Sequence, residues 1–224
     1  GSPLPEGNYV LLGSLDETVI QHGAEFNLGI HQYGENIYMP NGHKYIREFD
    51  CEIISRTIYR VGAVVLQKER MLVSFEPRVL IRYTLLESSS PTTLRFRPFL
   101  AFRSVNELTH ENPIASSNMD ECENGRYNQM YANFPNLYMQ FSKAIQYTHN
   151  PQWYKGIEYI KERDRGYDYK EDLLVPGYFE LPIKKGESII FSAGITECKT
   201  STLKSTWKKE LGRRISREDM FSTL

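Results

Sequence analysis

Short apolar runs separated by turn residues recur along most of the chain, and they predict β-strands joined by tight connections. Gln21-His22-Gly23 reads as a turn between two such strands. Residues 29–42 are polar and contain Gly and Pro, which favours a long loop. The strands predicted in the first half of the chain are 9–12, 18–20, 25–28, 56–61, 63–73, 79–86 and 92–102.

The clearest pattern is a long hairpin over residues 56–73. The β-branched and aromatic residues 57–61 lead into Gly62, which suits a turn or bulge, and an alternating run follows. The strand predicted over 92–102 has two faces of different character, because side chains alternate along a strand. One face carries Leu94, Phe96, Pro98 and Leu100, and the other carries Arg95, Arg97 and Phe99.

The second half of the chain adds more strands after a polar, irregular stretch at 103–128. The last of them, 187–195, is apolar on both faces, which suits a strand covered on both sides. Because no helical pattern separates the strands, the sequence predicts a mainly β protein built as an antiparallel β-sandwich. The strands predicted in this half are 129–131, 138–141, 145–148, 171–175, 178–181 and 187–195.

The pattern changes at Thr200, where a helix is predicted to begin. Thr200, Ser201 and Thr202 offer N-caps. A helical stripe follows, with Lys and Arg on the opposite face. The helix either packs on the sandwich or connects to a further domain, and the second interpretation is favoured because apolar residues continue to the end of the chain. The stripe consists of Leu203, Trp207, Leu211 and Ile215.

Composition excludes several classes of function. The formal net charge is −1, so no basic field is present to bind nucleic acid. Three widely spaced cysteines form no CxxC pair, which predicts free thiols in a reducing, cytoplasmic compartment. No apolar run is long enough for a transmembrane helix, and residues 1–5 show no signal peptide. His22, His31 and His43 lack metal-ligand spacing, so no metal or cofactor is expected.

Residues 153–177 stand out because aromatic rings are interleaved with carboxylates and arginines. Rings can stack on the C–H faces of a sugar, while carboxylates and Arg hydrogen-bond its hydroxyls. The segment is therefore either a functional surface that meets a sugar or another domain, or a long loop fastened by Arg–carboxylate pairs. His110-Glu111 is a further acid/base candidate, although adjacent residues on an extended chain point in opposite directions. His149 is expected at a turn before Asn150-Pro151.

Several motifs, in this order, resemble those of bacterial and archaeal glycogen debranching enzymes, the amylo-α-1,6-glucosidases. Residues 14–19, SLDETV, are similar to their SKLDETV stretch, and residues 59–62, YRVG, to their YRVGG-type hairpin. Residues 98–113 resemble their RPLLAFRDFHSLTHENP region. Residues 153–177 match the pattern WYxxFEYxxExxRGxDxxEDLxxPG. The resemblance covers nearly the whole chain.

The resemblance implies both a fold and a role. Family members carry an N-terminal β-sandwich, similar to the galactose-mutarotase-like supersandwich, followed by an (α/α)6 barrel with the catalytic carboxylates. This chain would then hold no catalytic residue. It implies a sandwich domain at 1–199 and a helical connector at 200–224 toward the catalytic barrel as partner. Contact with α-glucan, such as glycogen or maltooligosaccharide, is a further expectation.

The sequence also supplies candidate residues for a substrate or interdomain surface. Trp153 and Tyr154 are expected to stack or pack, and Arg165 to pair with a nearby carboxylate at 168, 171 or 172. Two alternatives are a purely structural scaffold and a mutarotase-like epimerase, which would need imidazole and carboxyl groups converging in one cleft. The candidates are Trp153, Tyr154, Glu158, Arg165, Asp168, Glu171, Asp172, His110 and Glu111.

Overall fold

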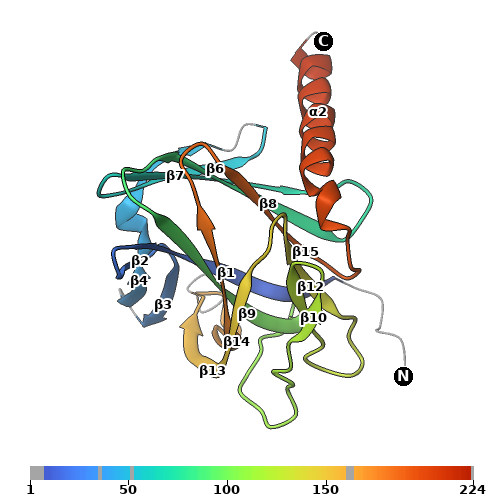
Figure 1. The fold of residues 1–224 in the computed structure, drawn as a ribbon. Helices are drawn as coiled ribbons and strands as arrows, with labels where there is room; N and C mark the ends of the chain where they lie inside the picture. Colours follow the sequence, from blue (N-terminus) through green and yellow to red (C-terminus); the bar gives the residue numbers. More distant parts are fainter. Residues whose placement is uncertain (1–7, 35–36, 51–52, 160–163, 223–224) are drawn as a thin grey trace.

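The computed structural model describes residues 8–34, 37–50, 53–159 and 164–222, and two large antiparallel sheets stacked face to face dominate it (Figure 1). The first sheet has five strands in the order β13-β14-β9-β1-β2. The predicted antiparallel β-sandwich is therefore confirmed. The strands of this sheet are β1 (Tyr9–Gln21), β2 (Ala24–Asn27), β9 (Thr92–Ser104), β13 (Gln146–Glu158) and β14 (Lys170–Ile183).

The second sheet has eight strands in the order β10-β11-β12-β15-β8-β7-β6-β5. Its β6–β7 hairpin turns between Val61 and Val64, as the sequence predicted for residues 56–73. The last strand of the chain, β15, lies between β12 and β8 and is buried along most of its length. The strands are β5 (Ile46–Asp50), β6 (Ser55–Val61), β7 (Val64–Leu72), β8 (Arg78–Glu87), β10 (Asp120–Cys122), β11 (Gly125–Asn128), β12 (Leu137–Phe141) and β15 (Ser188–Gly194).

The segment predicted as a long loop at 29–42 is structured instead. It contains β3 (Ile30–Gly34) and β4 (Ile37–Asn41), which pair with each other, and it is followed by the short helix η1 (Gly42–Tyr45). β3 lies beside β13, outside the five-stranded sheet. Main-chain bonding explains the difference: the Gly42 amide donates to the Gly29 carbonyl at 3.0 Å, so the segment folds back on itself.

Three further predictions were wrong. The long-loop interpretation does not hold for most of 153–177, because 153–158 lie in β13 and 170–177 in β14, and these strands pair from Gln146–Glu180 to Glu158–Lys170. The strand predicted at 171–175 lies within β14. The turn expected at Asn150-Pro151 is a bulge inside β13, an edge strand where a missing amide donor is tolerated. The strand predicted at 129–131 is irregular chain with a bend at 130–131, although Met130 is 1% exposed in the core. Its apolar character reflects burial rather than strand pairing.

The core between the sheets follows the alternation seen in β9. Leu94, Phe96 and Leu100 belong to the main cluster between the sheets. Phe99 and Ala101 belong to a smaller cluster that also contains residues of β13 and β14. β9 is thus buried on both faces, and its outward face is where side chains of the candidate site gather.

A buried carboxylate links the two sheets. Glu17 on β1 is 2% exposed and accepts a hydrogen bond from the Tyr83 hydroxyl of β8 at 2.6 Å. Lys68 of β7 lies 2.6 Å from the same carboxylate oxygen. Burial, and next the charge of Glu17, raises the pKa of Tyr83 well above its ordinary value, so the phenol remains a donor.

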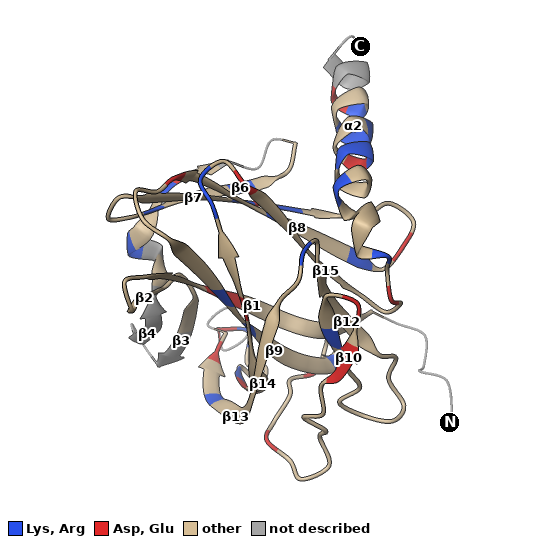
Figure 2. Ribbon diagram, viewed as in Figure 1, with Lys and Arg blue, Asp and Glu red and all other residues tan. Residues whose placement is uncertain are grey.

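The predicted C-terminal helix is present and leaves the sandwich. After the short turn η2 (Thr200–Thr202), α2 (Leu203–Ser222) begins with Leu203 and Trp207 buried against Leu80 and Ile190. The stripe does not stay buried, since Ile215 is 41% exposed. The far part of α2 projects from the sandwich, with Lys and Arg along it (Figures 1 and 2). The side chains of residues 219–224 lie outside those described.

We predict that Tyr83→Phe destabilises the sandwich by about 1–3 kcal/mol, because it removes a donor from a buried carboxylate. Urea denaturation monitored by circular dichroism measures the change. Tyr178→Phe is the matched control, because no hydrogen bond to its hydroxyl is found among the described residues. Equal midpoints for the two variants would contradict a stabilising role for the Glu17 contact.

We predict that Trp207→Ala costs about 3–5 kcal/mol, since it empties the site where α2 packs on β8 and β15. Ile215→Ala, farther along the same helix, should change the free energy of unfolding by less than about 0.5 kcal/mol. Denaturant melts of both variants measure this. A similar loss for both would mean that α2 is held along its whole length rather than at its first turns.

Candidate functional site

The predicted site residues come from three segments that meet at one end of the five-stranded sheet: the end of β13, the start of β14 with residues before it, and the loop at 105–112. Glu171 is the centre of this meeting point and is 0% exposed. The Arg103 guanidinium donates to it from β9, at 2.5 Å through Nε and 3.2 Å through Nη2. The Thr109 amide donates at 2.8 Å and the Tyr159 hydroxyl at 2.7 Å.

Asp172, the next residue along β14, connects the same three segments through its own hydrogen bonds. Its Oδ1 accepts from the Gly156 amide at 2.9 Å, and its Oδ2 accepts from the Glu111 amide at 2.9 Å. Its own amide donates to the Thr109 carbonyl at 2.8 Å. Gly156 has a φ of +74° at the bulge of β13, a conformation that glycine adopts without strain. We call Arg103, Thr109, Tyr159, Glu171 and Asp172 the carboxylate clasp.

Each carboxylate oxygen of the clasp already accepts at least one hydrogen bond from the protein itself. Burial, and next the hydrogen bond to Glu171, raises the pKa of Tyr159 well above its ordinary value. The phenol therefore stays protonated and keeps donating to the carboxylate. The sequence left open whether this segment is a functional surface or a structural clasp, and for Glu171 and Asp172 the contacts are those of a clasp.

An exposed rim surrounds the clasp. His110 Nε2 lies 3.1 Å from Asp168 Oδ2, and the two side chains are 54% and 63% exposed. Lys155 forms an ion pair with Glu111, and this hydrogen bond raises the pKa of the lysine. The rim consists of His110, Glu111, Lys155, Arg165, Tyr167 and Asp168.

Arg165 and Tyr167 form the other part of the rim. The Arg165 guanidinium lies 5.6 Å from the centre of the Tyr167 ring, which is itself 61% exposed. Both line an open cavity of about 750 Å³ together with Asp168 and residues 105–108. Of the carboxylates expected to pair with Arg165, Glu171 and Asp172 are held by the clasp, and pairing with Asp168 stays a prediction.

Trp153 and Tyr154 pack rather than stack on each other. Trp153 is half-buried against the main core, whereas Tyr154 packs against Phe99, with ring centres 4.9 Å apart. Glu158 lies beyond them, 3.8 Å from Lys170. The two rings therefore belong to different clusters and do not make one shared platform for a sugar.

A family model described as glycogen debranching enzyme N terminal matches residues 2–190. The chain belongs to this family. The match confirms the resemblance drawn from the motifs at 14–19 and 153–177, and it covers the clasp, the rim and every strand of both sheets except the end of β15. A search of curated proteins returns no match to this debranching-enzyme N-terminal domain.

Several solved structures are also similar to this debranching-enzyme domain, but only weakly. A bacterial glucoamylase complexed with acarbose matches 89% of this chain at 7% identity and a TM-score of 0.44, and this chain spans 31% of it. The heparan sulfate lyase HepC from Pedobacter heparinus matches 69% of this chain at 15% identity and a TM-score of 0.40, and this chain spans 22% of it. Because both TM-scores are low, the family membership rests on the sequence match.

The debranching-enzyme domain has a second group of polar residues that sequence reasoning missed. Asp16, on the SLDETV motif, bonds to His31, with Nε2 at 2.9 and 3.0 Å from its two oxygens. His31 has no metal-ligand spacing in the sequence, so its pairing with a carboxylate was not predicted. Alternation in β1 was the available signal: Leu15 and Val19 enter the main core, so Asp16 and Thr18 must point to the other face.

The described part of the domain offers no metal site, no membrane-spanning helix and no reactive thiol among its described cysteines. Among the described residues, no group of His, Cys, Asp and Glu side chains could hold a metal ion. No described helix is long and apolar enough to cross a membrane. Cys122 and Cys198 are free, and burial raises the pKa of Cys122 to about 12, which makes this thiol a poor nucleophile.

We predict that Glu171→Gln destabilises the domain by about 3–5 kcal/mol, because it leaves the Arg103 guanidinium without its buried counterion. Asp168→Asn, a similar change at a 63% exposed carboxylate, should cost no more than about 1 kcal/mol. Guanidinium chloride denaturation of both variants measures the difference. If Glu171→Gln were as mild as Asp168→Asn, the clasp would not be a stabilising element.

Proposed function

We propose that this chain is a non-catalytic accessory domain of a glycogen debranching enzyme, an amylo-α-1,6-glucosidase. In this proposal the domain supports an (α/α)6 catalytic domain in the same protein, and its rim contacts α-glucan at the edge of the shared cleft. Residues 1–199 form the accessory sandwich, and residues 200–224 form the connector. The family match is the observation that carries the proposal.

The state of the carboxylates supports a non-catalytic role. Hydrolysis of a glycosidic bond needs two carboxyl groups, held roughly 5 to 9.5 Å apart across the bond, that are available to the sugar and to water. Glu171 and Asp172 instead accept bonds from amides, a guanidinium and a phenol. The catalytic acid and base are therefore assigned to the barrel in this proposal.

The rim has the chemistry that suits a sugar. The Tyr167 ring, the Arg165 guanidinium and the Asp168 carboxylate line one open cavity, and His110 contacts Asp168 at 3.1 Å. Charged donors and acceptors make the stronger hydrogen bonds to hydroxyls. The clasp beneath holds the loop at 109–111 to β14 by main-chain and carboxylate bonds. A preorganised surface of this kind loses less entropy when it binds.

α2 supports the proposed connector. Its first turns are fixed to the sandwich: Glu123 accepts from the Thr200 amide at 3.0 Å and from its hydroxyl, and Trp207 is 2% exposed. The rest of the helix projects away (Figure 1). The proposed location is the cytoplasm, which the free thiols of Cys122 and Cys198 support.

A purely structural scaffold is the second candidate, and the clasp itself favours it. A buried Arg–carboxylate network stabilises a surface whether or not any ligand meets that surface. The two proposals differ in what the exposed rim does. Under the scaffold proposal, Tyr167 and Asp168 would tolerate substitution without any effect on sugar binding.

Calorimetric titration of the chain with maltoheptaose tests the proposal. We expect binding in the millimolar range or tighter, weakened about tenfold by Tyr167→Ala. Glu121→Gln is the control, since this side chain is 83% exposed on the other sheet. Binding that Tyr167→Ala and Asp168→Asn leave unchanged would remove the rim from glucan contact and favour the scaffold.

A further inference from the structure

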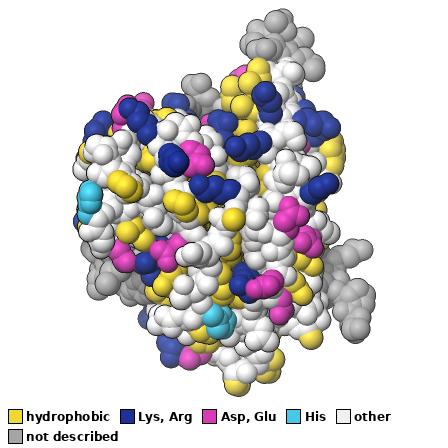
Figure 3. Space-filling model, in the orientation of Figure 1, with side chains coloured by type: hydrophobic (Ala, Val, Ile, Leu, Met, Phe, Trp, Pro, Cys, Tyr) yellow, Lys and Arg dark blue, Asp and Glu magenta, His cyan; other side chains and the backbone are white. Residues whose placement is uncertain are grey.

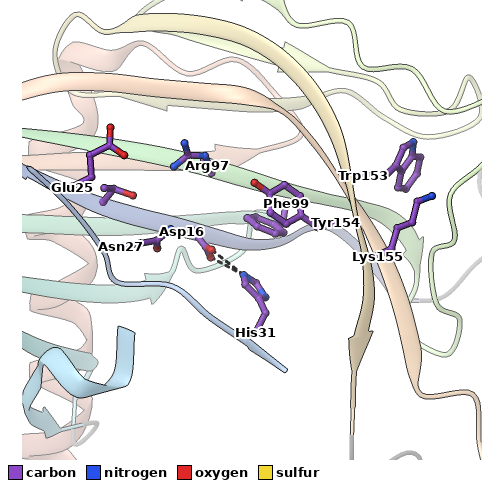
Figure 4. Close-up of a pocket in the computed structure, with 10 residues that line it drawn as sticks. Asp16, Glu25, Asn27, His31, Arg97, Phe99, Trp153, Tyr154 and Lys155 are labelled. Atoms are coloured by element: carbon purple, nitrogen blue, oxygen red, sulfur yellow. Dashed lines mark hydrogen bonds and ion pairs between the residues drawn. The ribbon is translucent and has the colours of Figure 1, made fainter. Parts of the chain in front are cut away.

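A second groove lies on the outer face of the five-stranded sheet, the face that points away from the core between the sheets, and Tyr154 lines it. It has a volume of about 680 Å³, within the usual range for small-ligand sites. β1, β2 and β9 contribute its floor, and β3 and β13 contribute residues at its sides (Figure 4). None of the rim's aromatic or acidic residues lines it. Lys155 is shared with the rim, and Trp153 lines the groove at the same end as Lys155.

Thr18 gives the first indication that the groove takes a polar ligand. The residue is 2% exposed and lines the groove, yet its hydroxyl has no hydrogen-bond partner among the described residues. Buried hydroxyls are almost always paired, because the loss of water is otherwise uncompensated. A hydroxyl-bearing ligand in the groove would supply the missing partner.

Asp16 is held in place at the floor. Its carboxylate is 4% exposed and bonded to His31, whose ring stacks on Phe99 at 4.5 Å. A Cβ at position 29 would lie 2.3 Å from Asp16 Oδ2 and clash with it. Glycine at this position therefore leaves room for the Asp16 carboxylate. A carboxylate has about four acceptor positions, so Asp16 can accept further donors while bound to His31.

The charges around the groove cancel. Asp16, Glu25, Arg97 and Lys155 all line it, and Asp16 and Arg97 are opposite each other on the neighbouring strands β1 and β9. Arg97 makes no ion pair within the described part of the chain, and its ring contact is with Tyr178 at 5.1 Å. Its guanidinium carries five N–H donors in a fixed fork. Such a mixture disfavours a ligand with net charge, and it suits a neutral molecule with many hydroxyls.

We infer that this groove is a binding site for a neutral saccharide, separate from the rim. The Thr18 hydroxyl, the Asp16 carboxylate and the Arg97 guanidinium bind sugar hydroxyls from the floor. The ring of Tyr154, packed on Phe99, gives an apolar wall for the C–H face of the sugar. An apolar ligand would leave Thr18 unpaired, and the balanced charges of the lining give no net attraction to an anion.

Calorimetric titration of the chain and its variants with maltotriose tests this site. Thr18→Val keeps the shape and removes only the hydroxyl, and Arg97→Gln removes the charged donors. We expect each to weaken binding about tenfold or more. Ser14→Ala is the matched control, because Ser14 also has an unpaired buried hydroxyl on β1 but does not line the groove. Since the Thr18 hydroxyl has no partner, Thr18→Val should not lower the melting temperature.

The outcomes separate this inference from the proposed function. Maltotriose binding that is weakened by Thr18→Val and Arg97→Gln, but not by Ser14→Ala or Asp168→Asn, supports the groove. Binding weakened only by the rim variants Tyr167→Ala and Asp168→Asn overturns the groove and leaves the proposed function standing. Absence of heat up to about 10 mM maltotriose overturns the groove as well. Tighter binding of the anionic sugar D-glucuronate would contradict the charge argument.

Discussion

The ion pair between Glu171 and Arg103 is the interaction on which the rest of the candidate surface depends. A fully buried carboxylate is unfavourable unless donors replace the lost water, and here a guanidinium, an amide and a phenol do so. These donors come from β9, from the loop after it and from the end of β13. One carboxylate therefore fixes the positions of segments that are distant in sequence, and the rim residues are carried on those segments.

Adjacent carboxylates serve different faces in two places in the chain. Glu17 points between the sheets to Tyr83 and Lys68, while Asp16 points outward to His31. Glu171 enters the clasp from one side and Asp172 from the other. The strand alternation explains both cases, because neighbouring side chains point to opposite faces. Outside these paired sites the surface carries charges of both signs, with Lys and Arg more frequent toward α2 (Figure 3), in keeping with a formal net charge of −1.

The sequence predicted those features that depend on residues close together in the chain. The β6–β7 hairpin, the two faces of β9 and the start of α2 at Leu203 follow from alternation, Gly62 and helical spacing. The long-loop interpretation of 153–177 was wrong for 153–158 and 170–177, because the carboxylates there looked solvated. Their partners lie far away: Arg103 is 68 positions from Glu171, and Thr109 is 62. Alternation in β1 places Asp16 on the outer face of the sheet, but nothing near either residue in the sequence specifies its contact with His31.

The carboxylates of Glu171, which is buried, and Asp172, which is partly exposed, hold the loop at 109–111 in one preformed geometry. This loop has no regular secondary structure, so protection of its amides from hydrogen exchange must come from the clasp. The Thr109 and Glu111 amides, which donate to Glu171 and Asp172, can be followed by NMR in deuterated buffer. The account predicts that they exchange as slowly as amides of the central strand β9. Exchange at the rate of an unstructured peptide would contradict it.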